Sequence, residues 1–130
     1  MRSKITTHQQ DRGADWRTVE APLDVATELA KVPAGQVVLL DCATLWLSNH
    51  LLAGHDLVAQ SALLRQALAV CASPVVVVSN EVGWSIVPEN KLARLFQKAQ
   101  GRLNQDLAQE ADLVLAVIAG LPIVLKSGQP

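Results

Sequence analysis

This sequence of 130 residues contains an aspartate directly after an apolar run, a position that suits metal binding. The run VVLLDC places Asp41 directly after four apolar residues. In nucleoside triphosphate hydrolases and kinases, a carboxylate at such a strand end holds Mg²⁺ directly or through water. An Asp at the end of a strand is also frequent as a turn or capping residue. The motif alone therefore leaves a metal site and a structural role open.

A second candidate is the segment SNEVGWSIVPEN, in which Asn80 and Glu81 follow another apolar run. Short loops that mix polar groups with an aromatic ring often line a binding pocket. The alternative is a tight connection between a strand and a helix, with Glu89 and Asn90 capping that helix. The segment GRLNQDLAQEAD follows, and its polar residues Arg102, Asn104, Gln105 and Asp106 are predicted to form a solvated helix face.

Hydrogen-bonding side chains are densest in the first segment, MRSKITTHQQDRGADWRTVEAP. Its polar and aromatic groups include His8, Asp11, Arg12, Trp16, Arg17 and Glu20. A polar terminus is most often a solvated, frayed end, and part of an active site is the other interpretation. The remaining histidines, His50 and His55, flank an apolar turn, and their spacing from cysteines and carboxylates does not indicate a metal site.

The spacing of the apolar residues predicts the elements that must position these side chains. Helices are expected at 22–32, 56–72 with Asp56 as N-cap, and 89–110, and strands at 36–42, 75–79, 112–120 and 121–126, while 44–52 is either a short helix or a packed loop. The run Val75–Val78 suggests a strand buried on both faces. This order predicts an α/β fold, a mostly parallel sheet flanked by helices, in one domain spanning residues 1–130. The carboxyl ends of parallel strands share an edge, so Asp41, Asn80 and Glu81 are expected to converge.

Composition excludes several classes of function. The formal net charge is −1, from 11 basic and 12 acidic residues that do not form patches, which argues against nucleic-acid partners and anionic membranes. No apolar run approaches the ~18 residues of a membrane span, and no signal peptide is recognisable, so we expect a cytoplasmic protein. Cys42 and Cys71 lie in apolar surroundings and are predicted to be free thiols in the core rather than a disulfide.

Three segments together resemble the bifunctional adenosylcobinamide kinase / adenosylcobinamide-phosphate guanylyltransferase family of cobalamin (vitamin B12) biosynthesis. They are KITTHQQDRGADWRTVEAP, VVLLDCATLWLSN, and the stretch from VVVVSNEVG through GRLNQ to LPIVLK. The resemblance implies a P-loop NTPase-like fold. It implies an enzyme that phosphorylates adenosylcobinamide with ATP or GTP and then transfers GMP from GTP to adenosylcobinamide phosphate. It also implies Mg²⁺ and a homo-oligomer, a trimer.

The resemblance also assigns roles to individual residues. His8 matches the catalytic nucleophile that carries a covalent guanylyl group. Nucleotide binding is implied for Gln9, Gln10, Asp11, Arg12, Glu20 and Asp41. Asp41 is in addition the residue implied for Mg²⁺.

One part of the family pattern has no match among these residues. Family members begin with a strand and a glycine-rich loop, G-G-x-R-S-G-K-S, whose backbone N–H groups and lysine bind phosphates. We therefore expect an N-terminally truncated family member, the C-terminal portion of the family domain without its first strand and phosphate-binding loop. Two alternatives to an active enzyme remain: an inactive remnant or interaction module, and a guanine-nucleotide-binding protein without transfer chemistry.

Overall fold

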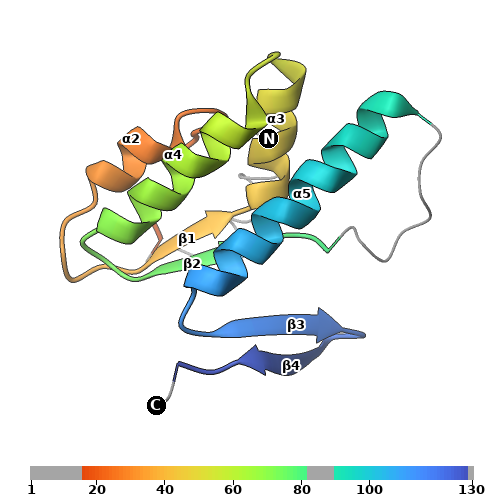
Figure 1. Ribbon diagram of the computed structural model, residues 1–130. Coiled ribbons are helices and arrows are strands. Elements are labelled where there is room, and N and C mark those ends of the chain that lie inside the picture. The colour runs from red at the N-terminus through yellow and green to blue at the C-terminus, as the bar shows by residue number, and fades with distance from the viewer. Residues whose placement is uncertain (1–15, 82–89, 129–130) are drawn as a thin grey trace. The chain divides into compact units, whose positions relative to one another are not determined.

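The computed structural model describes residues 16–81 and 90–128 of the chain (Figure 1). It divides the chain into two compact units, Met1–Asn80 and Glu81–Pro130, and each is described by itself. In the described residues, none of the helices combines the length and the apolar character that crossing a bilayer requires.

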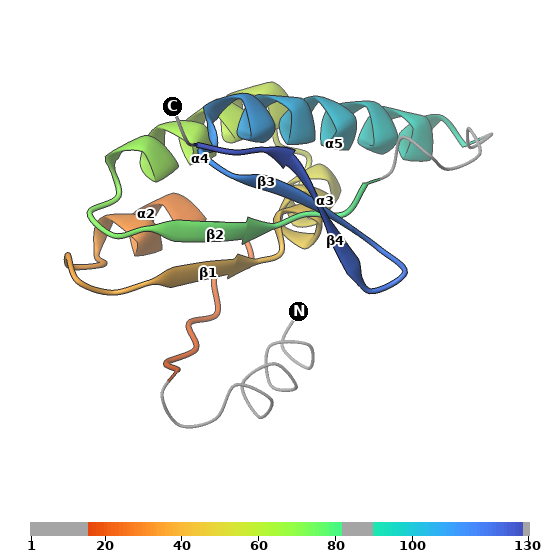
Figure 2. The same ribbon diagram turned by 90° about the horizontal axis from the view of Figure 1, so that it is seen from below.

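The first unit is built on two parallel strands, β1 (Val38–Asp41) and β2 (Val75–Val78). Their register pairs Val38 with Val75 and Asp41 with Val78, so both strands end at the same level. Three helices lie on one side of the pair (Figures 1 and 2): α2 (Val25–Ala30), α3 (Ala43–Leu52) and α4 (Leu57–Val70). The parallel arrangement follows from the connection, because parallel neighbours need a long crossover, here supplied by helices.

The core of the first unit is aliphatic, as its composition requires. Leu47 and Leu64 are almost fully buried, and the side chains of Leu29 and Trp46 are buried as well. Along β2 the burial alternates, and Val76 keeps 54% of its surface exposed. The expectation that Val75–Val78 is buried on both faces is therefore wrong for the described residues, because the helices of this unit cover one face.

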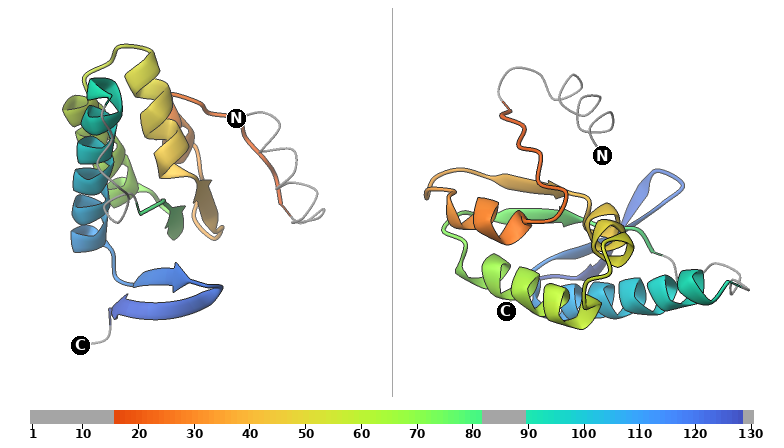
Figure 3. Two further views of the ribbon diagram at one scale, coloured as in Figure 1. Left: turned by 90° about the vertical axis from the view of Figure 1, so that its right-hand side faces the viewer. Right: turned by 90° about the horizontal axis from the view of Figure 1, so that it is seen from above.

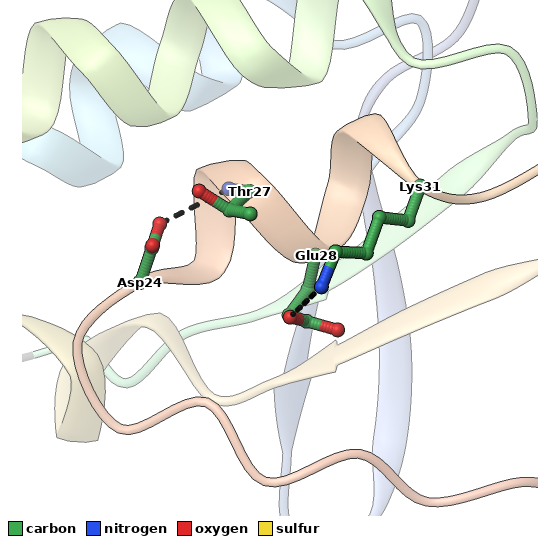
Figure 4. A network of polar contacts seen from close by, with 4 residues as sticks. All are labelled: Asp24, Thr27, Glu28 and Lys31. Atoms are coloured by element: carbon green, nitrogen blue, oxygen red, sulfur yellow. Dashed lines mark hydrogen bonds and ion pairs between the residues drawn. The ribbon is translucent and has the colours of Figure 1, made fainter.

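Local capping explains where the helices of the first unit begin. Asp24 Oδ1 accepts a hydrogen bond from Thr27 N at 3.1 Å, and Lys31 Nζ lies 3.1 Å from Glu28 Oε2 (Figure 4). Hydrogen bonds from the Thr27 side chain and backbone hold the pKa of Asp24 below its ordinary value. Asp56 caps α4 in the same way, as predicted, by accepting from the N–H groups of Val58 and Ala59.

The second unit consists of one long helix, α5 (Lys91–Glu110), and an antiparallel hairpin of β3 (Val114–Ile118) and β4 (Leu121–Lys126). The turn residues Ala119 and Gly120 both have positive φ, 53° and 77°, which matches the twist of a two-residue hairpin. Lys126 Nζ donates to the carbonyls of Ala108 and Gln109, where a cation complements the carboxyl end of α5.

Most predicted elements are present, and two differ in form. The segment left open between helix and loop is the helix α3. The fourth predicted strand, β4, pairs antiparallel with β3 and departs from the mostly parallel sheet expected. The physical reason is the connection, because two residues can join antiparallel strands and are too few for a parallel crossover.

The N-cap of α5 allows a test of how much such capping hydrogen bonds contribute to stability. Asn90 Oδ1 accepts from the N–H groups of Leu92 at 2.8 Å and Ala93 at 3.1 Å. Replacing Asn90 with alanine is expected to lower the free energy of unfolding by about 1 kcal/mol, because two amide donors lose their acceptor. Urea unfolding followed by circular dichroism measures the change. Asn90→Asp keeps the acceptor and serves as the control. Equal stability of the alanine and aspartate variants would contradict the capping role.

Candidate functional site

The candidate site lies at the carboxyl edge of β1 and β2. Asp41 ends β1 opposite Val78, and Ser79 and Asn80 follow directly. Thr44, in the first turn of α3, contacts both residues that follow β2. Its Oγ1 accepts a hydrogen bond from Asn80 N at 2.8 Å and lies 3.5 Å from Ser79 Oγ. The predicted convergence of Asp41 and Asn80 is thereby confirmed, whereas Glu81 belongs to the second unit and is not placed relative to them.

Sequence reasoning did not single out Thr44. Its signal is a hydroxyl three positions after a strand-end aspartate, inside the first turn of the following helix. Cys42 lies between them as the N-cap of α3, and its Sγ accepts from Leu45 N at 3.4 Å. Cys42 is a buried free thiol, as predicted, and Cys71 is free and half-buried.

The side-chain donor atoms at this edge are oxygens. They are the half-buried Asp41 carboxylate and the hydroxyls of Thr44 and Ser79, and hard oxygen donors are those that Mg²⁺ prefers. Mg²⁺ is usually held by one or two carboxylates together with substrate phosphates, rather than by a cage of protein ligands. The described residues contain no group of three His, Cys, Asp or Glu side chains able to hold a metal.

The other predicted site residues divide into two sets. His8, Gln9, Gln10, Asp11 and Arg12 lie outside the described residues. Glu20 is described, and its side chain is exposed in the stretch between residue 16 and α2. Of the segment SNEVGWSIVPEN, residues 82–89 also lie outside, and Asn90 is the helix cap that one interpretation predicted.

The GRLNQ segment has contacts within its own helix. Arg102 is an exposed side chain that pairs with Asp106 at 3.4 Å, one turn along α5. Asn104 Oδ1 accepts from Gln100 Nε2 at 2.8 Å, and Gln100 is buried. The prediction of a solvated face therefore holds for Arg102 and Gln105, whereas Asn104 is half-buried and the Asp106 side chain is largely covered.

A second polar constellation in the first unit was missed by the sequence reasoning. Three side chains of α3 donate hydrogen bonds to the carbonyls of two consecutive residues, Pro22 and Leu23. Trp46 Nε1 and His50 Nε2 reach Leu23 O at 3.0 and 2.9 Å, and Asn49 Nδ2 reaches Pro22 O at 2.9 Å. We call these three side chains the α3 clamp. Sequence positions 46, 49 and 50 share one helix face, which was the available signal.

The tautomer of His50 follows from its partners. A carbonyl only accepts, so Nε2 of His50 carries a proton toward Leu23. The neutral ring then accepts at Nδ1, and His55 Nδ1–H donates to it at 2.8 Å. Burial lowers the pKa of His50, the bond to Leu23 partly opposes this, and the charge of His55 lowers it further. His50 is therefore a neutral, structural histidine next to Trp46, whose ring meets it edge-on at 4.7 Å.

The lowered pKa of His50 predicts a pH dependence of stability. Above pH 6.5, the ordinary histidine pKa, the ring is neutral in both folded and unfolded chains. As the pH falls below 6.5, the unfolded chain binds a proton first, so the free energy of unfolding falls until the folded pKa is reached. Thermal unfolding between pH 7.5 and 5.5 is expected to show this decline, and His50→Gln is expected to flatten it. A decline of equal slope in both proteins would contradict the assignment to His50.

Comparison with known proteins identifies the family of the chain. Residues 1–125 match the sequence model of the CobU family, described as cobinamide kinase / cobinamide phosphate guanyltransferase. The bifunctional adenosylcobalamin biosynthesis protein CobP of Pseudomonas aeruginosa is 38% identical over 133 residues, which cover 100% of this chain and 76% of that protein. The proteins named CobU of Salmonella typhimurium and Escherichia coli are 34% and 37% identical, over 97% of this chain and 78% of each relative. The chain therefore belongs to the cobinamide kinase / cobinamide phosphate guanyltransferase family.

Proposed function

We propose that this protein phosphorylates adenosylcobinamide with ATP or GTP and transfers GMP from GTP to the resulting adenosylcobinamide phosphate. The observation that carries the proposal is the match of nearly the whole chain to a family of kinase/guanyltransferases. The carboxyl edge of β1 and β2 supports it, because ligands of parallel α/β sheets bind at such edges. The proposal includes a P-loop NTPase-like fold, residues 1–130 acting as one enzymatic domain, and a homotrimer.

The guanylyl transfer is proposed to proceed in two displacements at His8. A neutral imidazole nitrogen attacks the α-phosphorus of GTP, an N–P bond forms, and pyrophosphate leaves with the electron pair of the broken P–O bond. A phosphate oxygen of adenosylcobinamide phosphate then attacks the same phosphorus, and the N–P bond breaks. The products are adenosylcobinamide-GDP and the free histidine. Covalent catalysis thus divides one difficult transfer into two easier ones.

The remaining residues are proposed to bind and orient the nucleotide. Arg12 supplies a guanidinium for the charge that spreads over the α-phosphate oxygens. Gln9, Gln10, Asp11 and Glu20 are proposed to contact the guanine nucleotide. Asp41 is proposed to hold Mg²⁺, which when bound neutralises phosphate charge.

Labelling of the purified chain tests the proposal. The chain is incubated with Mg²⁺ and GTP labelled at the α-phosphate, digested with trypsin at neutral pH, and its peptides are mapped. Acid-labile label is expected in the tryptic peptide 5–12, ITTHQQDR, whose one histidine is His8. A parallel reaction with γ-labelled ATP and adenosylcobinamide measures the kinase step. Absence of label contradicts the transfer chemistry, and GTP binding without label favours a nucleotide-binding protein. A chain that neither binds nor reacts favours the inactive remnant.

The role of Asp41 predicts a specific defect. Asp41→Asn keeps the shape of the side chain and removes its charge, so the apparent affinity for Mg²⁺ in the labelling reaction is expected to fall about 10- to 100-fold. Titration of the labelling rate with Mg²⁺ measures this change. High Mg²⁺ is expected to restore part of the rate. An unchanged Mg²⁺ titration would contradict the metal-binding role.

A further inference from the structure

We propose that the α3 clamp, Trp46, Asn49 and His50, positions the strand-edge site relative to the segment that carries Glu20. The inference deepens the proposed function and rests on it for its catalytic consequence. It assigns these three side chains as positioning residues for guanylyl transfer. The chemistry they supply is hydrogen-bond donation to main-chain carbonyls, and none of them is proposed to touch the nucleotide.

The geometry of the clamp is that of a fixed anchor. Trp46 and His50 are buried, so their rings are locked by packing before they donate. Both reach the carbonyl of Leu23, which thereby uses both of its lone pairs. Asn49 reaches the preceding carbonyl, that of Pro22. Three bonds to two consecutive peptide groups fix both the position and the orientation of the chain there.

His55 supports the clamp from outside α3. Its Nδ1–H bond to His50 Nδ1 leaves the opposite ring nitrogen of His50 as the donor to Leu23. Such an outer hydrogen bond selects the tautomer and orients the ring. The His50 ring is therefore held at both nitrogens, by Leu23 O on one side and by His55 on the other. Support of this kind from a neighbouring residue is typical of sites that need precise positioning.

The clamp and the strand edge are connected by one short, rigid element. α3 begins two residues after Asp41, and Thr44 in its first turn holds the backbone of Asn80. From Thr44 to Asn49 the helix rises about 7.5 Å, at 1.5 Å per residue. Glu20 precedes Pro22 by two residues, a reach of at most about 7 Å. In both views of Figure 3 the end of this stretch next to α2 lies beside α3, and the stretch runs away from α3 toward residue 16. A displacement of the clamp would therefore displace Glu20 relative to Asp41.

The experiment compares the loss of one clamp donor with a loss of stability elsewhere. Asn49→Leu removes the amide donor at similar size, and Asn49→Gln retains an amide donor. Asp24→Ala is the matched control, because it removes the cap of α2 next to Leu23 and leaves the three clamp donors in place (Figure 4). Thermal unfolding of each variant measures how much stability it loses.

Two readouts separate positioning from stability. The first is the rate of trypsin cleavage after Arg17, which lies in the stretch that the clamp anchors. The second is His8 labelling, separated into its maximal rate and the GTP concentration at half-maximal rate. For Asn49→Leu we expect faster cleavage after Arg17 and a maximal rate on the order of 10- to 100-fold lower, because small misplacements of reacting groups are costly. Asn49→Gln is expected to restore part of both.

The outcomes decide between the alternatives. Unchanged cleavage after Arg17 in Asn49→Leu overturns the inference. Equal loss of labelling in Asn49→Leu and Asp24→Ala also overturns it, because a general loss of stability would then explain both. Faster cleavage with an unchanged labelling rate overturns the catalytic consequence. A wild-type chain without His8 label contradicts the proposed function alone, and Arg17 cleavage then decides whether the clamp anchors the segment.

Discussion

Replacing His8 with alanine is expected to reduce covalent guanylyl labelling by at least about 10³-fold. Losses of this size follow removal of a catalytic nucleophile, because the remaining groups still bind substrate but have no atom to form the bond. The measurement is the rate of acid-labile label from α-labelled GTP, resolved by peptide mapping. Label in peptide 5–12 of the wild type and none in the variant is the expected result.

Three further measurements make the His8 result specific. Thermal unfolding of His8→Ala is expected to match the wild type, so that loss of label reports chemistry rather than loss of fold. GTP binding by equilibrium dialysis is expected to persist. Label that survives the substitution at the wild-type rate would place the nucleophile elsewhere in the chain, and mapping would then identify the peptide that carries it.

Replacing Leu47 with alanine is expected to have the largest effect on stability. Leu47 lies near the middle of α3 and has no exposed surface. Removing a buried leucine side chain loses its transfer free energy and leaves a cavity, at a cost of about 2–5 kcal/mol. Proteins are typically stable by only about 5–15 kcal/mol, so this substitution removes a large fraction of that margin. Urea unfolding followed by circular dichroism gives the change in free energy.

The matched control for Leu47→Ala lies on the same helix. Leu52 ends α3 and is 76% exposed, so Leu52→Ala makes the same chemical change without opening a cavity. Its effect is expected to stay within about 0.5 kcal/mol, as for most surface substitutions. Comparable losses for the two variants would contradict the placement of Leu47 in the core.

The sequence was informative where structure depends on near neighbours. The caps at Asp56 and Asn90 use acceptors two and three residues from their donors, and both were predictable. The shared edge of Asp41 and Asn80 was also predictable, because parallel strands end together. The pairing of β4 was not predictable in this way, because its apolar sequence does not indicate which strand it pairs with or in which direction. Its hairpin turn uses Ala119 and Gly120 rather than the usual Asn-Gly, so the turn signal was weak.

Contacts between distant parts of the chain were not predictable. The α3 clamp joins residues 23 to 27 positions apart, and nothing in local spacing indicates which carbonyls Trp46, Asn49 and His50 will meet. Thr44 and Asn80 are likewise 36 positions apart. The roles assigned to His8 and its neighbours came from a family resemblance rather than from their spacing, and they stay proposals.

The clamp has a consequence for how substitutions are tolerated, because it is specified by side chains on one partner only. Pro22 and Leu23 contribute peptide oxygens, and every amino acid carries one. The Leu23 side chain is 37% exposed, so its identity is free to drift while the contact persists. The helix supplies the donors through side chains and has no such freedom at positions 46, 49 and 50. In related chains we expect the three donor side chains of α3 to be retained. The segment at Pro22 and Leu23 would show no such sequence pattern, because it contributes only peptide oxygens.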